Sequence, residues 1–397
     1  MINLQRRGIV DTYSQFSFSR SSLARDSRGR IYYPQNARFE VGKFGQAVLI
    51  EEGTTNLISN PGFENDFVSW GTWSSPSVAE IITIDRYEGT KSFHVIANGY
   101  NGGKTQSVTV TGGATYTVSV YVKRVSGRPK VMQLISNPSG TTLGDKEATG
   151  AIGQWVRYSM TVTIPTNDNS LQILLGGAYD GGTAEAYYDA VQVEAKPYAT
   201  SFINGTRAAD LLTVPTTGIF PDVTNFSIEL FAKADTVKTD GYQGIFGGRN
   251  IGGAPPVDLL IHTNNNLYLF YYDSTETSLF INTGYSISNR TSWHYYAVTF
   301  SNGTVKLFVD GVKVKEATIT LKQYTGIGNF YLGRSISNSE YWNGLIDNLR
   351  ISNIARSDTE IANAYNSGQP LQADANTTLL LNFDGPDAQR AAKSLVI

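Results

Sequence analysis

The sequence contains no cysteine, has few charged residues and lacks a long apolar run, and each shortage excludes a class of protein. Without cysteine, neither a disulfide framework nor a thiolate metal site can stabilise the fold. Residues 1–7 hold no apolar stretch of the kind that a secretory signal needs. No segment approaches the roughly 18 apolar residues of a membrane-spanning helix. We therefore expect no membrane insertion, and a stability that comes from buried cores, bound ions or association.

Aromatic residues and glycine are plentiful instead. The 397 residues include 23 Tyr, 18 Phe and 39 Gly, whereas only 17% are charged. Aromatic residues favour strands and glycine favours turns, so this mixture is typical of β-proteins. The length suits two domains of roughly 150–200 residues each. We predict an all-β fold class with two tandem antiparallel β-sandwiches.

The first 54 residues differ from the rest of the chain. Residues 1–50 contain seven Arg and one Lys against three acidic residues, and their apolar positions are scattered. A basic segment of this kind is expected to bind an acidic surface of a partner. Alternatively, it is a solvated loop in which the arginines are incidental. We interpret residues 1–54 as an irregular N-terminal docking segment, with a first domain at residues 55–205 and a second domain at residues 206–397.

Short strands separated by turn signals fill both domains. In the first domain we predict strands at residues 92–97, 105–110, 115–125, 130–135, 155–164, 171–175 and 184–194. In the second domain we predict them at residues 226–232, 242–247, 257–262, 267–272, 279–282, 293–301, 304–309, 312–320, 329–332, 344–352 and 378–384. Asp310 and Gly311 between two apolar runs indicate a tight hairpin. Ser357 and Glu360 indicate the capped start of a helix at residues 357–366.

The ends of the first domain resemble a known family. The run NLISNPGFE at residues 56–64, followed by Trp70 and closed by YYDAVQVE at residues 187–194, resembles the jelly-roll carbohydrate-binding modules of families four, nine and twenty-two. The resemblance covers residues 55–205. It implies a calcium ion near the opening turn, with ligand positions at Glu64, Glu88, Lys91 and Asp189, where Lys91 would contribute only its backbone carbonyl.

Calcium chemistry is reasonable at such a site, because Ca²⁺ takes six to eight oxygen ligands and accepts carbonyls beside carboxylates. In the alternative interpretation, Glu64 is a turn acceptor and Asp189 caps the end of a strand.

The same resemblance implies that sugar binds against aromatic faces. The available platforms in the first domain are Trp70, Trp73, Tyr87, Tyr100 and Tyr179. Trp70 occupies the position of a core residue in the family, so we expect it to pack rather than bind. We predict carbohydrate contacts at Tyr100, Tyr179 and Trp73, and at Trp342 in the second domain.

Several runs in the second domain look like a laminin G-like, concanavalin A-like sandwich. They are FSIELFAK at residues 226–233, WHYYAVTF at 293–300, LFVDG at 307–311 and GLIDNLRI at 344–351. Asp347 is expected to be a structural acceptor rather than a metal ligand. Residues 379–385 resemble the opening strand of such domains, so this segment either closes the sheet from the other end or begins another repeat.

Catalytic signatures are missing. A retaining glycosidase needs two carboxylates about 5 Å apart, and no alternating acidic strand supplies them. The three histidines, His94, His262 and His294, have neither a nucleophile signature nor metal spacing near them. The domains are acidic on balance and the basic segment has no reader motif, so we expect no nucleic-acid partner. We predict that the protein is not an enzyme and has no catalytic residues.

The N-terminal segment suggests where the protein works. FSRSSLAR at residues 18–25, leading to AVLIEEGTTNL at residues 47–57, is similar to the lead-in of many phage tail and minor structural proteins. This similarity implies a virion surface protein of the tail, fibre or capsid-decoration class. Residues 1–54 would contact other virion proteins, the sandwiches would meet host polysaccharide, and association would favour a trimer. The alternatives are a secreted glycan-binding module or glycosidase appendage, and a structural spacer without sugar binding.

Overall fold

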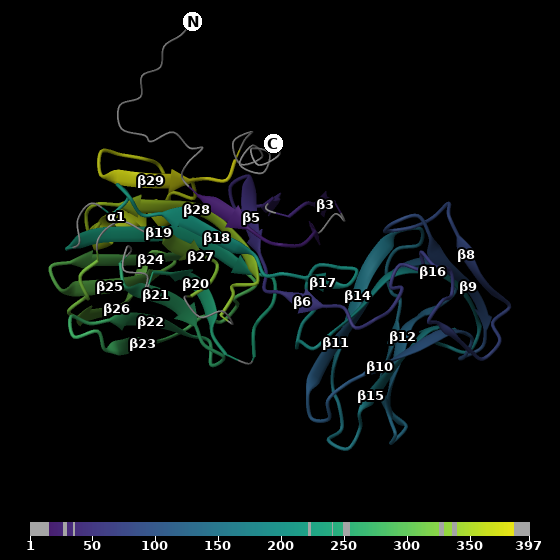
Figure 1. Ribbon diagram of the computed structural model, residues 1–397. Helices are drawn as coiled ribbons and strands as arrows, with labels where there is room; N and C mark the ends of the chain where they lie inside the picture. The colour runs from purple at the N-terminus through teal and green to yellow at the C-terminus, as the bar shows by residue number, and fades with distance from the viewer. Residues whose placement is uncertain are drawn as a thin grey trace, which may run out of the picture. The chain divides into compact units, whose positions relative to one another are not determined.

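The computed structural model describes residues 16–26, 30–34, 36–220, 224–239, 241–248, 255–324, 329–335 and 340–384 (Figure 1). As predicted, regular structure in these ranges is almost entirely antiparallel strand. The described residues form two compact units. One contains residues 23–31 and 53–207, and the other contains the described parts of 1–22, 32–52 and 208–397.

Residues 53–207 fold into a sandwich of two five-stranded sheets. We call one the front sheet, with strand order β13-β12-β15-β10-β7, and the other the back sheet, with order β14-β11-β16-β9-β8. The front strands are β7 (Gly71–Trp73), β10 (Gly103–Thr109), β12 (Lys130–Asn137), β13 (Thr141–Glu147) and β15 (Ser170–Gly176). The back strands are β8 (Val78–Ile82), β9 (Ser92–Asn98), β11 (Thr115–Ser126), β14 (Trp155–Thr163) and β16 (Thr183–Glu194). Two short pairs join β2 (Ala24–Arg25) to β3 (Ile31–Tyr32) and β6 (Thr54–Thr55) to β17 (Thr206–Arg207).

In this first sandwich, every second side chain along a strand is buried in the core. In β11, Val118, Val120 and Val122 are buried in the core between the sheets, as the alternation predicts. Trp70 is buried against Phe63, with ring centroids 5.1 Å apart. The expected core role of Trp70 is therefore confirmed.

The second sandwich pairs a seven-stranded sheet with an eight-stranded sheet. The seven-stranded order is β1-β18-β27-β20-β21-β22-β23, and the eight-stranded path is β26-β25-β24-β19-β28-β5-β4 with β29 also paired to β28. The first sheet contains β1 (Ser17–Ser19), β18 (Leu211–Pro215), β20 (Gln243–Gly247), β21 (Val257–Ile261), β22 (Asn266–Tyr272), β23 (Ser278–Ser286) and β27 (Asn329–Leu332). The second contains β4 (Arg38–Val41), β5 (Gln46–Ile50), β19 (Asn225–Ala234), β24 (His294–Ser301), β25 (Thr304–Val309), β26 (Val312–Thr318), β28 (Gly344–Ser352) and β29 (Thr377–Leu381).

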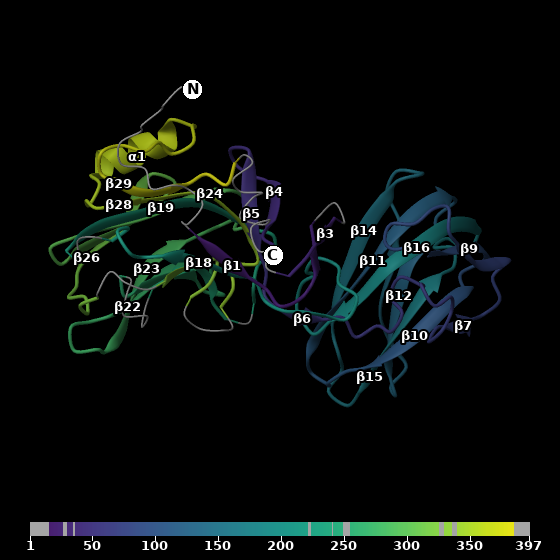
Figure 2. The ribbon, with the colours of Figure 1, turned by 45° about the horizontal axis from the view of Figure 1, so that its top comes forward.

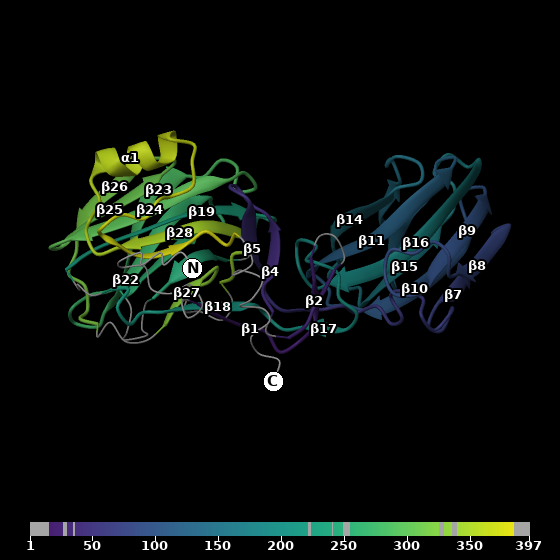
Figure 3. The same cartoon turned by 90° about the horizontal axis from the view of Figure 1, so that it is seen from above.

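Helix α1 (Asp358–Asn366) covers the outer face of the eight-stranded sheet (Figures 2 and 3). The predicted capping box is present, because Ser357 accepts from the Glu360 backbone N–H while the Glu360 carboxylate accepts from the Ser357 backbone. Ile361 is buried against Phe231 and Tyr295. The helix therefore forms a third layer.

The predicted hairpin at Asp310 and Gly311 joins β25 to β26. Both residues have positive φ, at 51° and 76°. A two-residue turn of this kind needs positive φ at both positions, which glycine adopts freely and aspartate tolerates.

The expected irregular N-terminal segment needs correction. Its residues 38–50 form β4 and β5, and β5 pairs with β28 through Val48 opposite Ile346. The run from Ala47 to Ile50 is buried, so it lacks the alternation of a half-exposed strand. Arg38 gave a misleading polar signal, because its charge is buried and paired with Glu51 and Asp210. Residues 1–15 lie outside the described ranges.

The C-terminal strand belongs to the same sheet. β29 pairs with β28 from Leu349 to Ser352, next to the stretch of β28 that pairs with β5. Leu379 and Leu381 are buried in the core. Of the two interpretations of this segment, the structure therefore supports a strand that extends the sheet of its own domain.

Candidate functional site

The front sheet of the first sandwich presents a mixed polar and apolar surface outward. Residues directly opposite each other on antiparallel strands share a face. Leu134 and Ile173 are such a pair and lie in the core, so the adjacent row points away from it. That outward row crosses four strands and consists of Asp145, Gln133, Leu174 and Thr105.

Two more outward positions lie on either side of this row. Gln172 is opposite Ile135 and Ser107. Trp73 is opposite Gly103, which is itself opposite Gly176. We call the outward residues the front face; its members are Trp73, Thr105, Gln133, Asp145, Gln172 and Leu174, with Tyr100 and Lys130 at one end.

Trp73 and Tyr100 flank one buried lysine at that end. The Lys130 ammonium lies 5.9 Å from the centroid of each ring and 2.8 Å from the Asp145 carboxylate. Tyr100 lies in the loop between β9 and β10 and is 60% exposed. Its ring packs against Gly181, where an added Cβ would come within 2.6 Å of the ring. Two of the predicted platforms are thus held around a single ion pair.

Tyr179 lies at the same end of the sandwich, in the loop between β15 and β16. Its backbone N–H donates to the Arg128 carbonyl at 2.6 Å, and the Arg128 guanidinium lies 5.4 Å from its ring. Arg128 also pairs with Glu147 at 2.6 Å. Tyr179 is partly exposed, but it contacts Arg128 rather than Lys130.

Trp342 was predicted to contact carbohydrate, and the structure contradicts this. Its side chain is 0% exposed in the core of the second sandwich. The indole N–H donates to the carbonyls of Lys233 and Leu345, each at 3.2 Å. A buried tryptophan whose N–H is satisfied by the backbone fills the core and offers no face to a ligand.

Two of the expected metal ligands converge on one turn, formed by residues 87–91. Glu64 accepts from the backbone N–H groups of Thr90 and Lys91, at 2.7 and 3.0 Å. Asp189 accepts from the backbone of Tyr87 and Glu88, at 2.9 and 2.8 Å. Two segments far apart in the sequence thus hold the same turn, and the contacts of Glu64 are those of a turn acceptor, as in the alternative interpretation.

Asp189 sits in an unfavourable environment for a carboxylate. Burial, with a smaller contribution from the nearby charge of Glu64, raises its pKa to about 8, although hydrogen bonds from the Tyr87 and Ala190 backbone act in the opposite direction. Two adjacent carboxylates with hard oxygen donors suit Ca²⁺. Within the described ranges, however, no cluster of three or more His, Cys, Asp or Glu side chains is placed to hold a metal ion. A bound Ca²⁺ would therefore need backbone carbonyls and water as further ligands.

The side chains of the other two predicted ligand positions have different partners. The Glu88 carboxylate pairs with Arg25 from the short strand β2. The Lys91 ammonium lies 2.7 Å from Asp66. Glu88 and Lys91 could therefore contribute only their backbone oxygens.

Sequence reasoning missed most of the polar residues of the front face. Gln133 and Asp145 occupy outward positions on β12 and β13, and Lys130 begins β12. The available signal was the alternation of Gln133 with Met132 and Leu134, which marks an outward position in a strand. Gln133 and Trp73 lie in the same sheet because of the strand order, and a short stretch of sequence does not reveal that order.

Tyr87 was among the available platforms, but sequence reasoning did not place it against Tyr121 and Trp155 of the back sheet. The rings of Tyr87 and Tyr121 are stacked with centroids 3.5 Å apart, and Trp155 meets Tyr87 edge-on at 6.3 Å. Asp85 accepts from the Trp155 indole N–H at 3.2 Å. These rings are closely packed against one another, which leaves less of their faces for a ligand than Tyr100 has.

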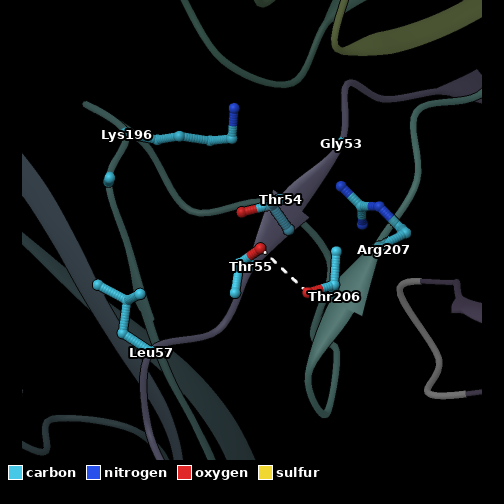
Figure 4. A pocket seen from close by; sticks show the side chains of 8 residues that line it. Gly53, Thr54, Thr55, Leu57, Lys196, Thr206 and Arg207 are labelled. Carbon is cyan, nitrogen blue, oxygen red and sulfur yellow. Dashed lines mark hydrogen bonds between the residues drawn. The ribbon is translucent and has the colours of Figure 1, made fainter.

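A shallow hollow of about 430 Å³ lies beside the β6–β17 pair (Figure 4). The Thr55 and Thr206 hydroxyls are 3.1 Å apart in it, and the leucine at 57 lies farther along the wall. Arg207 donates to the Ser201 hydroxyl, so its side chain supports the loop before β17. None of the predicted site residues lines this hollow.

In the part of the chain that the structure describes, no helix is long and apolar enough to cross a membrane.

Comparisons with known proteins match the two sandwiches separately. Residues 55–180 match a family model described as a carbohydrate binding domain. Residues 205–362 match one described as the concanavalin A-like lectin/glucanases superfamily. The chain thus contains a region similar to carbohydrate-binding domains, followed by a region similar to concanavalin A-like domains. These domains support a glycan-binding role.

Among solved structures, similarity is low. The botulinum neurotoxin serotype D binding domain is 17% identical with a TM-score of 0.32, over 41% of this chain and 44% of that one. The CBM22-1 xylan-binding domain from Paenibacillus barcinonensis is 19% identical with a TM-score of 0.30, over 38% and 99%. The SAP-like pentraxin from Limulus polyphemus is 13% identical with a TM-score of 0.32, over 41% and 80%. No curated protein matches the sequence.

Proposed function

We propose that the protein is a non-enzymatic glycan-binding protein and that the front face of the first sandwich is its binding surface. The observation that carries the proposal is the placement of the Trp73 and Tyr100 rings around Lys130, at the end of a row of outward polar side chains. Aromatic faces supply contact area for the C–H groups of a sugar ring, while amides and carboxylates hydrogen-bond its hydroxyls.

Each part of the front face has a role in this proposal. Trp73 and Tyr100 stack on successive sugar units, and the Lys130–Asp145 ion pair fixes the lysine between the two rings. Gln133 and Gln172 are half-buried, so their amides are held in place and lose little freedom when they bind hydroxyls. Leu174 forms an apolar floor between them.

Replacing Trp73 tests this surface. Trp73→Ala removes the largest platform. We expect the affinity of the full chain for polysaccharide, measured by its retardation in polysaccharide-containing native gels, to fall at least tenfold, which corresponds to about 1.4 kcal/mol. Soluble xylan, mixed-linkage β-glucan and galactan serve as probes. The matched control is Trp155→Ala on the back sheet, which should leave retardation unchanged. Equal loss in both variants, or loss in neither, would reject the front face.

We also propose a structural Ca²⁺ bound by Glu64, Asp189 and backbone carbonyls of the 87–91 turn. The support is the convergence of both carboxylates on that turn and the electrostatic relief that a cation would give to the buried Asp189. The ion would stiffen the turn and the closing strand β16.

Calcium removal tests this second proposal. A Ca²⁺ concentration of 100 times Kd should stabilise the protein by about 2.7 kcal/mol, which raises the melting temperature relative to protein in EDTA. Asp189→Asn removes one ligand oxygen and should abolish the rise. Asp66→Asn, which alters a neighbouring exposed carboxylate, should retain it. The same melting temperature with Ca²⁺ and with EDTA in the wild type would contradict the proposal.

The resemblance of residues 18–57 to phage proteins supports a further proposal, that glycan binding serves host adhesion from a virion and that the protein is trimeric. Residues 16–22 and 38–50 are partly engaged in the second sandwich, so contact with other virion proteins would fall largely on residues outside these strands. Mass spectrometry of purified particles should detect the chain in stoichiometric amounts. Its absence from particles would favour a secreted glycan-binding module.

A further inference from the structure

Strand β23 (Ser278–Ser286) ends the seven-stranded sheet of the second sandwich (Figure 1). Within the described ranges it pairs only with β22, which leaves its other side as an open sheet edge. Seven of its nine residues are exposed, among them Phe280 at 59%. The backbone of an open edge strand can pair with a strand of another chain, so this edge is a candidate interaction surface.

The open edge lacks the charged residues that protect many edge strands. Residues 278–286 read SLFINTGYS and contain no Asp, Glu, Lys or Arg. Strand β26, which ends the other sheet of the same sandwich, carries Lys313, Lys315 and Glu316. Charges on an edge strand oppose its pairing with a second copy, because like charges then meet. By this criterion β26 is protected against self-association and β23 is not.

The regular part of the open edge is short and well defined. Residues 278–282 lie opposite residues 268–272 of β22 without interruption. Beyond Asn282 the register shifts, and Gly284 has a φ of 71°. A bulge of this kind disrupts the hydrogen-bonding row of a strand, so it confines further pairing to the stretch before it. Residues 278–282, with the sequence SLFIN, are therefore the segment that an added strand would meet.

Apolar side chains extend from both faces of this segment. Leu279 and Ile281 lie opposite core residues of β22 and face inward, yet Leu279 is still 37% exposed. Phe280 faces outward beside Phe270, with ring centroids 5.4 Å apart. A strand added to the edge would cover Leu279 on one face and extend the row of Phe280 on the other. Burial of this apolar surface would stabilise the contact.

We propose that two copies of the chain associate through β23 in antiparallel orientation, with the Phe280 residues of the two copies directly opposite each other. Full overlap of residues 278–282 with their own copy centres the pairing on Phe280, because it is the middle residue of the five. A contact of this kind has twofold symmetry and is closed, since the same surface is used on both copies.

The contact predicts an even number of copies in the assembly. Two copies form through β23 alone, and six form if the proposed trimer is also present. The contact uses no residue of the front face, so it is independent of glycan binding.

Cross-linking tests the pairing of β23, because the chain has no cysteine and a single introduced thiol can link only to another copy. Directly opposite residues on antiparallel strands have Cβ atoms about 4.5–5.5 Å apart, whereas the Asn282 residues of the two copies would lie about 14 Å apart. We expect Phe280→Cys to form a disulfide-linked dimer at least tenfold faster than Asn282→Cys under mild oxidation. Val312→Cys, on β26 and 61% exposed, controls for random collision. Non-reducing gel electrophoresis measures the linked fraction.

Charge variants at Phe280 test the effect of the contact on assembly. Light scattering should give an even number of copies for the wild type and half that mass for Phe280→Lys and for Phe280→Glu, because like charges then lie opposite each other. An equimolar mixture of the two variants should regain the wild-type mass, which a misfolded chain would not do. Val312→Lys should keep the wild-type mass.

Three results would overturn the contact. They are a wild type with an odd number of copies, a Phe280→Cys variant that cross-links no faster than Asn282→Cys or Val312→Cys, and a mixture of Phe280→Lys with Phe280→Glu that stays at half the wild-type mass.

Discussion

The two tryptophans predicted to meet carbohydrate have opposite environments. Trp73 lies at the edge of the front sheet beside an exposed tyrosine, whereas Trp342 is enclosed by the second core. Both precede turn-forming residues, Ser74 and Asn343, so this local pattern does not separate them. What separates them is long-range packing: Trp342 meets Tyr296 edge-on at 6.3 Å, and its carbonyl accepts from Gln243.

Substitution of Trp342 should therefore affect stability rather than binding. Trp342→Ala leaves a large cavity, and we expect the free energy of unfolding of the second sandwich to fall by about 3–5 kcal/mol. Urea denaturation measures this loss. Trp73→Ala, at the sheet edge, should change the unfolding free energy by less than about 1 kcal/mol. If Trp342→Ala were as stable as the wild type, the residue would not be the core anchor that its burial implies.

At the scale of elements, the N-terminal strands are the main difference between expectation and structure. β4 and β5 extend the eight-stranded sheet, and a buried charge network holds them. Arg20 and Arg38 both pair with Asp210, and Arg38 also pairs with Glu51. Arg20 and Arg38, two of the arginines that suggested an acidic partner surface, thus find acidic partners within the chain.

Removal of the central carboxylate should destabilise the second sandwich strongly. Asp210→Ala leaves two buried guanidinium groups with less counter-charge, and breaking a buried pair in this way costs about 3–5 kcal/mol. Lys313→Ala breaks surface pairs with Glu316 and Asp358 and should cost less than about 1 kcal/mol. Thermal and urea unfolding compare the two variants. A similar small loss in both would mean that the network does not hold the N-terminal strands.

Sequence reasoning succeeded where the signal is local. The capped helix at Ser357, the hairpin at Gly311 and the alternating valines of β11 follow from propensities and periods that a short window contains. It failed for β5, because a strand buried on both faces has no alternation. It could not assemble the front face, because Gln133 on β12 and Trp73 on β7 share one face only through the strand order, with β15 and β10 between them.

At the scale of the whole molecule, the chain combines two sandwiches that each resemble a different family of glycan-binding domains. The family matches support glycan binding for both halves. The front face gives the first sandwich exposed rings beside amide groups and one ion pair.

The most direct measurement is the calorimetric titration of the full chain with an oligosaccharide derived from the polysaccharide that retards it most. The front-face account predicts saturable binding in the wild type and in Trp155→Ala, with Kd at least tenfold weaker in Trp73→Ala. It is contradicted if Trp73→Ala binds the oligosaccharide with the wild-type Kd.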